Sequence, residues 1–557
     1  MSKSNTFLII SDIGHERVLS NEGPDGGAVF PSLLTNPAAL TSSIDLQSKF
    51  DNSVEIKQIQ IPKMLNLLNE YLNPAQFFAV LGRCAKKIIL IGALSISTAQ
   101  AADQYFDGDY TSANSVVDGC VSGSCVWASS LTNWTNSTGT LNTTWGGGAN
   151  VAIFSGNAGL VSTPYENNSF GGMTFLTSGY EIYGITLTGA ASVNNFTAGT
   201  GITATIRNPL AGSNSYQFQG GGNFILGSAT SYDAKCTYTG NTTIAANTTL
   251  QVYGYAVLGD TTCGTAGLCP GVYGGAISNS GTLRFSSNPP QTLTGNISGS
   301  GSLITEKATN GPLTLSGNNT YTGSTLVNSG TLVYGSAMAV PADSPMTSYS
   351  SVNISGQNIT RNASTTFVGF SSGMDLGGGS VTFNSGTHII TTLSGPGSVT
   401  VNSGATVYIY YPNDYSTINV TVNSGGKLIL GDPSNNTFAS TRVDNPNFNV
   451  TLAGGTLKIT PKASWNATFY VRIGALTQTG ASTLDMDSSS GYATNLTVET
   501  LNPNGSSLAV TNWTSGRDHL YATAITGSPS RNMNNIAPLN LIKMGSYAAT
   551  LTYWAET

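Results

Sequence analysis

The sequence predicts an all-β protein built as a right-handed parallel β-helix, a solenoid whose short strands stack rung upon rung. Three observations predict it: the composition, a repeat of about 20 residues, and an apolar alternation within each repeat. Only 9% of the 557 residues are charged, yet 39% are hydrophobic and 66 are glycine. Disordered chains carry more charge, and helical membrane proteins carry apolar runs of about 18 residues, which this sequence lacks. An antiparallel sandwich array is the alternative fold with a similar Gly- and Thr-rich composition.

The repeat is clearest in the C-terminal half of the chain. VTVNSGATVYI starts at Val399, and VTVNSGGKLIL starts at Val420, 21 residues later. In the first copy Val399, Val401, Val407 and Ile409 alternate with Thr and Tyr, so one face of the strand is apolar. Asn and Gly between the strands tolerate the positive φ that a sharp corner requires. A single rung cannot bury its apolar face, so we expect about 18–20 stacked rungs with Asn, Ser and Thr ladders at the corners.

The N-terminal hundred residues are predicted to be separate from this stack. Lys86 and Lys87 precede the apolar run Ile88–Ile96, and Ala99 and Ala101 then occupy the positions that a signal peptidase recognises. This order is typical of a signal peptide cleaved after Ala101. A buried core helix or a short membrane anchor is the alternative, although the run is short for a bilayer.

The signal-like segment, residues 64–101, lies unusually far from the start of the chain. Either translation begins at Met64 or the chain carries an extended leader, so residues 1–63 are interpreted as an atypical leader or a wrongly assigned upstream region. The motif SDIGH at residues 11–15 is interpreted as accidental. Cys84 would be removed with this leader.

The remaining cysteines are expected to reach an oxidising compartment. CVSGSC and CGTAGLC each close a short loop, which favours Cys120–Cys125 and Cys263–Cys269 as disulfides and leaves Cys236 over. A Cys236–Cys263 disulfide is the alternative, because spacing does not fix connectivity. The spacings are not those of a zinc site.

One stretch of the sequence resembles a known family. LTLSGNNTYTGSTLVNSGTLVYG, residues 313–335, is similar to the passenger-associated repeat of bacterial autotransporters. The positions in register with that repeat are Leu313, Leu315, Gly317, Asn319, Tyr321, Gly323, Thr325, Val327, Gly330 and Leu332.

The resemblance covers roughly residues 126–460 and includes a weaker copy at residues 238–254. It implies export, a β-helical passenger and presentation at the cell surface. We therefore expect residues 102–460 to form the rod and residues 461–557 to be a β-rich continuation or cap. Autotransporters end in a membrane β-barrel with alternating strands, and no such pattern is recognised in this tail.

No catalytic residue, metal site or cofactor is predicted. Gly369–Gly373 matches the esterase pattern G-x-S-x-G, but a Gly-rich segment follows where the nucleophile elbow needs a helix. Arg517, Asp518 and His519 are interpreted as a surface ion pair at a turn. Asp485 and Asp487 are interpreted as solvent-facing strand residues, with calcium ligation as the alternative. A frayed new N-terminus is expected around Asp103, Asp107 and Asp109.

The predicted function is that of an exported, cell-surface or extracellular structural or adhesion protein. The alternatives are a self-assembling filament or matrix subunit and a carbohydrate-active β-helix enzyme, a lyase or hydrolase. Glycans or proteins outside the cell are the expected partners, self-association is possible, and no transmembrane anchor is expected after cleavage. A net charge of −6 gives no basic surface for nucleic acid. A structural role is favoured for the glycosylation sequons, which begin at Asn133, Asn195, Asn241, Asn353, Asn419 and Asn466. Exposed tyrosines could stack on sugars, and the candidates are Tyr408, Tyr410 and Tyr411.

Overall fold

A computed structural model describes residues 102–526 of this chain with short gaps, together with four strands outside that range. The gaps are 109–112, 166, 230–234, 260–268, 308–310, 370–371, 413–415, 432–441, 461–467, 488–491 and 515–516. The chain divides into two compact units, Met1–Ser97 and Thr98–Thr557. The signal-peptide prediction, with Ala99 and Ala101, lies outside the described residues, as do Cys84, Cys263, Asp109 and Asn466.

In the first unit the described part is one antiparallel hairpin. Strand β1 (Leu8–Asp12) pairs with β2 (His15–Leu19), with Asp12 opposite His15.

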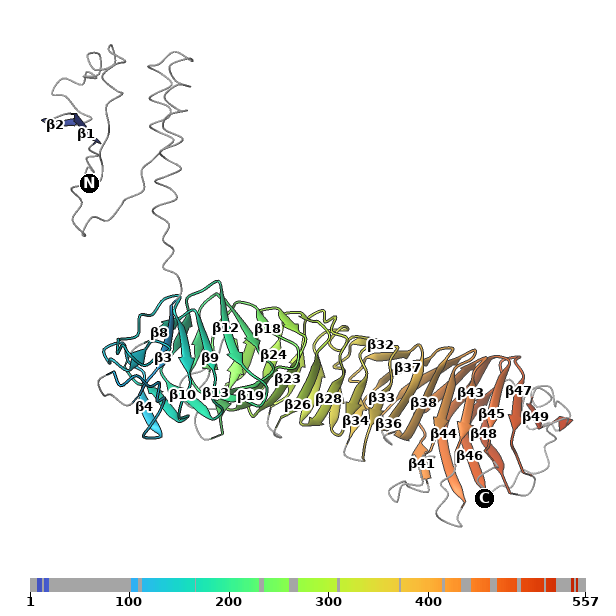
Figure 1. The fold of residues 1–557 in the computed structure, drawn as a ribbon. Coiled ribbons are helices and arrows are strands. Elements are labelled where there is room, and N and C mark those ends of the chain that lie inside the picture. The colour runs from blue at the N-terminus through green and yellow to red at the C-terminus, as the bar shows by residue number, and fades with distance from the viewer. Residues whose placement is uncertain are drawn as a thin grey trace, which may run out of the picture. The chain divides into compact units, whose positions relative to one another are not determined.

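The second unit is a parallel β-solenoid, which confirms the predicted fold (Figure 1). Each strand pairs in parallel with the equivalent strand of the next rung, and three successive strands make up a rung over most of the stack. Among the described residues the most continuous sheet contains eighteen successive strands, in line with the 18–20 rungs expected. The rungs differ in length: Thr242 pairs with Ile277, and Leu428 with Leu457.

The first position of the rung is occupied by two successive sheets. The N-terminal sheet contains β3 (Asp103–Phe106), β6 (Val151–Phe154), β9 (Gly172–Phe175), β12 (Val193–Ala198), β15 (Ser215–Gln219), β18 (Thr242–Ile244), β22 (Ile277–Asn279) and β25 (Ile297–Ser298). The C-terminal sheet contains β32 (Asn358–Arg361), β35 (Ser380–Phe383), β37 (Gly397–Val401), β39 (Ile418–Asn423), β42 (Phe448–Ala453), β44 (Phe469–Gly480), β46 (Thr494–Asn502) and β48 (His519–Ile525).

The second position of the rung is filled along the whole stack. Its strands are β4 (Ser124–Val126), β7 (Leu160–Thr163), β10 (Tyr180–Gly184), β13 (Thr203–Ile206), β16 (Asn223–Ser228), β19 (Thr249–Gly254), β23 (Thr282–Ser287), β26 (Ser302–Glu306), β28 (Thr325–Ser329), β30 (Met346–Ser348), β33 (Thr365–Phe367), β36 (Gly386–Ser394), β38 (Ala405–Pro412), β40 (Lys427–Leu430), β43 (Thr456–Ile459), β45 (Ser482–Asp485), β47 (Leu508–Thr511) and β49 (Ile542–Met544).

The third position holds shorter strands. They are β8 (Asn168–Phe170), β11 (Leu187–Gly189), β14 (Leu210–Ala211), β17 (Lys235–Cys236), β20 (Val257–Leu258), β21 (Gly271–Tyr273), β24 (Gln291–Leu293), β27 (Leu313–Leu315), β29 (Thr331–Tyr334), β31 (Ser351–Asn353) and β34 (Gly373–Asp375). Towards the C-terminus the rung becomes simpler, because β41 (Arg442–Asn445) and β42 both pair with the single long strand β44. Strand β50 (Tyr547–Ala548) pairs antiparallel with β49.

The core runs along the inside of the stack and is built by in-register apolar columns. Val399 pairs with Val420 and Val401 with Val422, so the two copies of VTVNSG occupy successive rungs. All four of these valines are buried. Like residues stack on like because a parallel ladder places each side chain over its equivalent, and the alternation leaves the polar neighbours outside.

The passenger-like repeat corresponds to one rung and the start of the next. Leu313 pairs with Leu332, and both are buried together with Leu315 and Val327. Gly330 adopts a positive φ of 79° at the corner between β28 and β29. A Cβ at Gly323 would lie 2.1 Å from the carbonyl oxygen of Gly301 one rung earlier, so this approach requires glycine. A Cβ at Gly317 would meet the same obstacle, 2.3 Å from the carbonyl oxygen of Gly295.

The polar members of the repeat connect neighbouring rungs. Asn319 is 1% exposed; its Oδ1 accepts a hydrogen bond from the Ile297 amide at 2.7 Å, and its Nδ2 donates to the Ala339 carbonyl at 2.7 Å. The hydroxyls of Tyr321 and Thr325 lie 2.7 Å apart in the core. The structure therefore assigns every position of this motif a structural place within the stack.

The N-terminal end of the stack is closed by an aromatic cap. Strand β5 (Trp134–Thr135) pairs antiparallel with β3, which places Trp134 beside Phe106 on the first rung. The rings of Trp127 and Trp145 lie 5.1 and 4.5 Å from that of Trp134. An antiparallel strand and a buried aromatic cluster at this end oppose further parallel pairing there.

Within the described residues, no helix is long and apolar enough to cross a bilayer.

Candidate functional site

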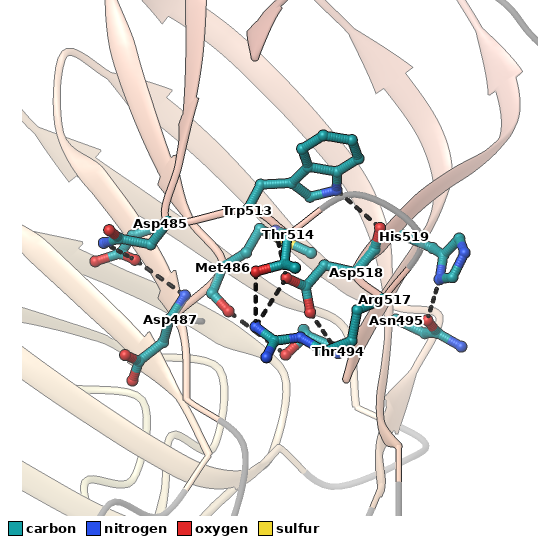
Figure 2. A network of polar contacts seen from close by, with 11 residues as sticks. Asp485, Met486, Asp487, Thr494, Asn495, Trp513, Thr514, Arg517, Asp518 and His519 are labelled. Atoms are coloured by element: carbon teal, nitrogen blue, oxygen red, sulfur yellow. Dashed lines mark hydrogen bonds and ion pairs between the residues drawn. The ribbon is translucent and has the colours of Figure 1, made fainter. Parts of the chain in front are cut away.

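The acidic pair Asp485 and Asp487 is buried, so the interpretation as solvent-facing strand residues is wrong. Asp485 ends β45 and is 9% exposed; Asp487 lies beyond the strand with a φ of 46° and is 7% exposed. Oδ1 of Asp485 accepts a hydrogen bond from the Asp487 amide at 3.0 Å (Figure 2). The same oxygen accepts from Nδ2 of Asn512 at 2.8 Å. Oδ2 of Asp487 lies 3.0 Å from Nζ of Lys458. These contacts compensate the buried carboxylates with protein donors and a cation.

The Arg517–Asp518–His519 cluster is an anchored loop rather than a surface ion pair. Asp518 is 1% exposed, and its carboxylate accepts from the amides of Thr494 at 3.0 Å and Thr514 at 2.7 Å (Figure 2). Nη2 of Arg517 lies 3.4 Å from the same carboxylate. The His519 ring is exposed and points to Asn495, away from Asp518. The predicted structural role holds, but the three side chains do not converge on a shared site.

The first aspartates of the solenoid belong to the fold and do not form a frayed terminus. Asp103 begins strand β3, and Asp107 is 1% exposed. Oδ1 of Asp107 accepts a hydrogen bond from the Asp118 amide at 3.2 Å. The expectation of a frayed end is therefore wrong for this segment.

The esterase-like motif has the wrong structural context for a nucleophile. Gly373 begins strand β34, where a nucleophile elbow would be followed by a helix. Ser372 Oγ donates to the Gly369 carbonyl at 2.6 Å. Ser371, the nucleophile position of the pattern, lies outside the described residues.

The cysteines lie near the N-terminal half of the stack. The structure joins Cys120 and Cys125 by a disulfide beside the aromatic cap. Cys236 is buried and carries no disulfide among the described residues, which argues against a Cys236–Cys263 pair. Because Cys263 is not described, the Cys263–Cys269 disulfide stays a prediction.

The strongest electrostatic perturbations lie inside the core. Burial lowers the pKa of Lys307 to about 7, and the Lys307 ammonium donates to the Pro289 carbonyl at 2.6 Å. Burial also lowers the pKa of His388 to about 4. Arg361 is fully buried and donates to the Pro341 carbonyl and to Oγ1 of Thr365. The sequence did not predict that Lys307, His388 and Arg361 face inward, because no feature of the repeat marks these positions.

The outer surface carries the predicted amide ladder. Nδ2 of Asn384 donates to Oδ1 of Asn362 at 3.0 Å, Asn402 to Asn384 at 2.7 Å, and Asn423 to Asn402 at 2.6 Å. Asn362 in turn donates to Asp343 at 2.9 Å. This chain of bonds, which we call the amide ladder, ties five rungs together along one corner.

The sequons and tyrosines are spread over several faces. Asn133 is fully buried, whereas Asn195, Asn241 and Asn419 are exposed and Asn353 is half-buried. Tyr408, Tyr410 and Tyr411 follow one another on β38 and are half-buried. They do not form a cluster with the sequons.

Two shallow depressions interrupt the surface of the C-terminal half. One, of about 310 Å³, is lined by β29, β31, β34 and β36 and includes Asn353 and Asp375. The other, of about 430 Å³, runs beside the start of β35, β37 and β39 and includes Asn358, Ser380, Ser398 and Asn419. Both are polar and open, unlike the enclosed apolar pockets that bind most small molecules. Their linings suit a hydroxyl-rich ligand.

Among the described residues no group of three or more His, Cys, Asp or Glu side chains is placed to hold a metal ion.

Comparison with known proteins gives one informative match. No protein-family model and no solved structure matches the chain. Over 160 residues it is 32% identical to the protein named adhesin BmaC autotransporter of Brucella suis biovar 1 (strain 1330). The match covers 28% of this chain and 4% of that protein's length. The β-solenoid and this similarity together support the resemblance to an autotransporter passenger that the repeat at Leu313–Leu332 indicated.

Proposed function

We propose that this chain is an exported adhesion protein that acts at the cell surface or outside the cell. The observation that carries the proposal is a parallel β-solenoid, similar in sequence to part of an autotransporter adhesin, whose outer surface is dominated by uncharged amides and hydroxyls. Such a surface gives many weak contacts rather than one deep pocket, and contacts made together along a rigid body add up to useful avidity.

An enzymatic function is less well supported by the same residues. Glycoside hydrolysis needs two carboxyl groups about 5–10 Å apart that flank the substrate. Asp485, Asp487 and Asp518 are buried and engaged by amides or by Lys458. Adhesion through the lateral faces requires no such arrangement.

The filament alternative is also less well supported. End-to-end parallel pairing requires open sheet edges, and at the N-terminal end of the first-position sheet the antiparallel strand β5 and the buried tryptophans oppose the addition of a parallel strand. Lateral association of faces remains compatible with an adhesive surface.

Expression of the full-length gene in a bacterium tests the proposal. We expect a product outside the cytoplasm whose mass corresponds to a chain starting at Ala102, and beads coated with it should adhere to surfaces rich in glycans or matrix proteins. Beads coated with the urea-unfolded chain are the control. An intact 557-residue product retained in the cytoplasm, or folded beads that adhere no better than the control, would contradict the proposal.

A further inference from the structure

The outer face of the C-terminal sheet carries six threonines in one column. Parallel pairing places each threonine directly over the next, from β32 through β35, β37, β39 and β42 to β44. The threonine column consists of Thr360, Thr382, Thr400, Thr421, Thr451 and Thr477.

The column faces outward along its whole length. Its members are half-buried or exposed, whereas the residues beside them in the strands, such as Val399, Val420 and Val450, are at most 1% exposed. Neighbouring rungs lie about 4.8 Å apart, so the column presents one hydroxyl and one methyl group at that interval.

Among the described residues, no side chain engages the hydroxyls of the threonine column. No side-chain hydrogen bond within the described residues involves them, although the polar columns on either side are bonded internally. On one side runs the amide ladder of Asn362, Asn384, Asn402 and Asn423. On the other side Ser380 donates to Asn358 at 2.7 Å, and Asn449 to Asn419 at 3.0 Å. The face thus has one continuously hydrogen-bonded flank, one partly bonded flank, and between them a line of hydroxyls that no described side chain engages.

The face is also uncharged over five rungs. From β32 to β42 the outward positions of the three columns hold Asn, Ser and Thr, with Ala453 at the last rung. The Arg472–Glu499 ion pair appears only further along the same sheet. Since no basic residue lies in these columns, the face offers no counter-charge for uronates or sulfated sugars, and a neutral partner is favoured.

A shallow, open depression lies beside the column. The depression of about 430 Å³ follows the flank of Asn358, Ser380, Ser398 and Asn419 and extends across Gly378–Gly379 and Gly397. A planar partner such as an ice surface would leave that depression empty. An extended polymer lying along the stack can rest in it while its hydroxyl groups meet the threonines.

We propose that the threonine column and this depression form a track for an extended, neutral polysaccharide chain lying along the solenoid. Successive sugar hydroxyls would hydrogen-bond to successive threonines, and the methyl groups would contact the apolar sugar faces. The proposal rests on the proposed adhesive function and specifies the class of ligand. The rigid flanks lower the ordering cost of binding, because the column is already in place before the ligand arrives.

The test compares two double variants of the full-length chain. Thr400→Val with Thr421→Val removes two central hydroxyls and keeps the side-chain shape. Thr347→Val with Thr366→Val is the matched control, because these two threonines are also paired, half-buried and outward-facing, on β30 and β33. Circular dichroism and urea unfolding establish that both variants keep the fold.

The probes are linear neutral oligosaccharides of two to eight sugars, the β-1,4-linked glucose, mannose and xylose series, with oligogalacturonate as the anionic comparison. Isothermal titration should show binding of at least one neutral series, with affinity rising with length up to about six sugars because the column has six hydroxyls. The Thr400/Thr421 variant should bind at least about tenfold more weakly, and the control variant within about twofold of the wild type.

Three results would overturn the track: no neutral series binds, oligogalacturonate binds more tightly, or the Thr400/Thr421 variant binds as well as the control. Inhibition of ice recrystallisation that is lost only in the Thr400/Thr421 variant would assign the column to ice and also overturn it. The bead assay keeps the two proposals separate. Adhesion that persists without polysaccharide binding leaves the adhesive function standing, and polysaccharide binding without adhesion contradicts only the adhesive function.

Discussion

Replacement of Lys307 by methionine should remove a pH dependence of the stability of the stack. Lys307 is 1% exposed, and its ammonium is held by the Pro289 carbonyl at 2.6 Å and Oγ of Ser287 at 3.3 Å. Among the described residues it has no ion-pair partner, so burial lowers its pKa to about 7.

The sign of the effect follows from the two pKa values. In the unfolded chain the lysine pKa is about 10.4, so between pH 7 and pH 10 the unfolded state binds more protons than the folded state. The free energy of unfolding therefore rises with pH in that window, by up to about 1.4 kcal/mol per unit. Because half of the folded molecules are already deprotonated at pH 7, the gain from pH 7 to pH 9 is about 2 kcal/mol.

Urea unfolding at pH 7, 8 and 9 and constant ionic strength, followed by circular dichroism, measures this gain. The Lys307→Met variant should lack it, while Lys427→Met, at a half-buried outer position, should follow the wild type. The absolute stability at pH 7 is less diagnostic, since the variant also leaves the Pro289 carbonyl without its donor, at about 1–3 kcal/mol. Wild-type and Lys307→Met stabilities that change in parallel between pH 7 and pH 9 would refute the reasoning.

Three further outcomes are expected. Burial lowers the pKa of His388 to about 4, so the free energy of unfolding of the wild type should fall by up to about 3 kcal/mol as the pH drops from 6.5 to 4. The His388→Phe variant should lack that loss in acid unfolding. Equal acid midpoints for the two proteins would contradict this prediction. Asn319→Ala leaves the Ile297 amide and the Ala339 carbonyl unpaired and should cost about 2–4 kcal/mol in urea unfolding, whereas the exposed Asn318→Ala should cost under about 1 kcal/mol. Asp518→Ala removes the acceptor for the amides of Thr494 and Thr514, so hydrogen exchange at these two amides should become at least about tenfold faster. Asp518→Asn should reproduce this effect only in part. Unchanged exchange in the alanine variant would show that the carboxylate does not hold the loop.

The repeat predicted the architecture because a parallel stack converts sequence periodicity directly into contact. Val399 lies over Val420 and Thr400 over Thr421, as the spacing of the two VTVNSG copies requires. Register needs no long-range information in this case, since each rung pairs with the next copy of itself. The same repeat spacing places the threonines in one column. That no described side chain bonds their hydroxyls could be learned only from the structure.

The polar residues that face inward could not be predicted in this way. Asp485, Asp518 and Lys307 occupy places where the repeat pattern is interrupted, and their burial depends on partners such as Asn512, Thr494 and Pro289 that come from other rungs or loops. Composition suggests exposure for charged residues, because their burial is rare without a partner. The burial of these charged residues therefore depends on contacts between rungs that the sequence pattern does not reveal.

The low charge and the binding surface have a common physical origin. A solenoid with few ionic groups must satisfy its outward polar atoms by stacking them, and the amide ladder does so by bonding Asn384 to Asn362 and Asn402 to Asn384. The longer asparagine side chains reach their equivalents on the next rung, whereas the hydroxyls of the threonine column make no side-chain hydrogen bond among the described residues. Beside the ladder that stabilises the rungs lies a regular line of hydroxyls that no described side chain engages, and the bonded amide ladder holds one flank of that line in place. A partner whose own hydroxyls repeat along a chain can meet several members of that line at once, which a compact ligand cannot do.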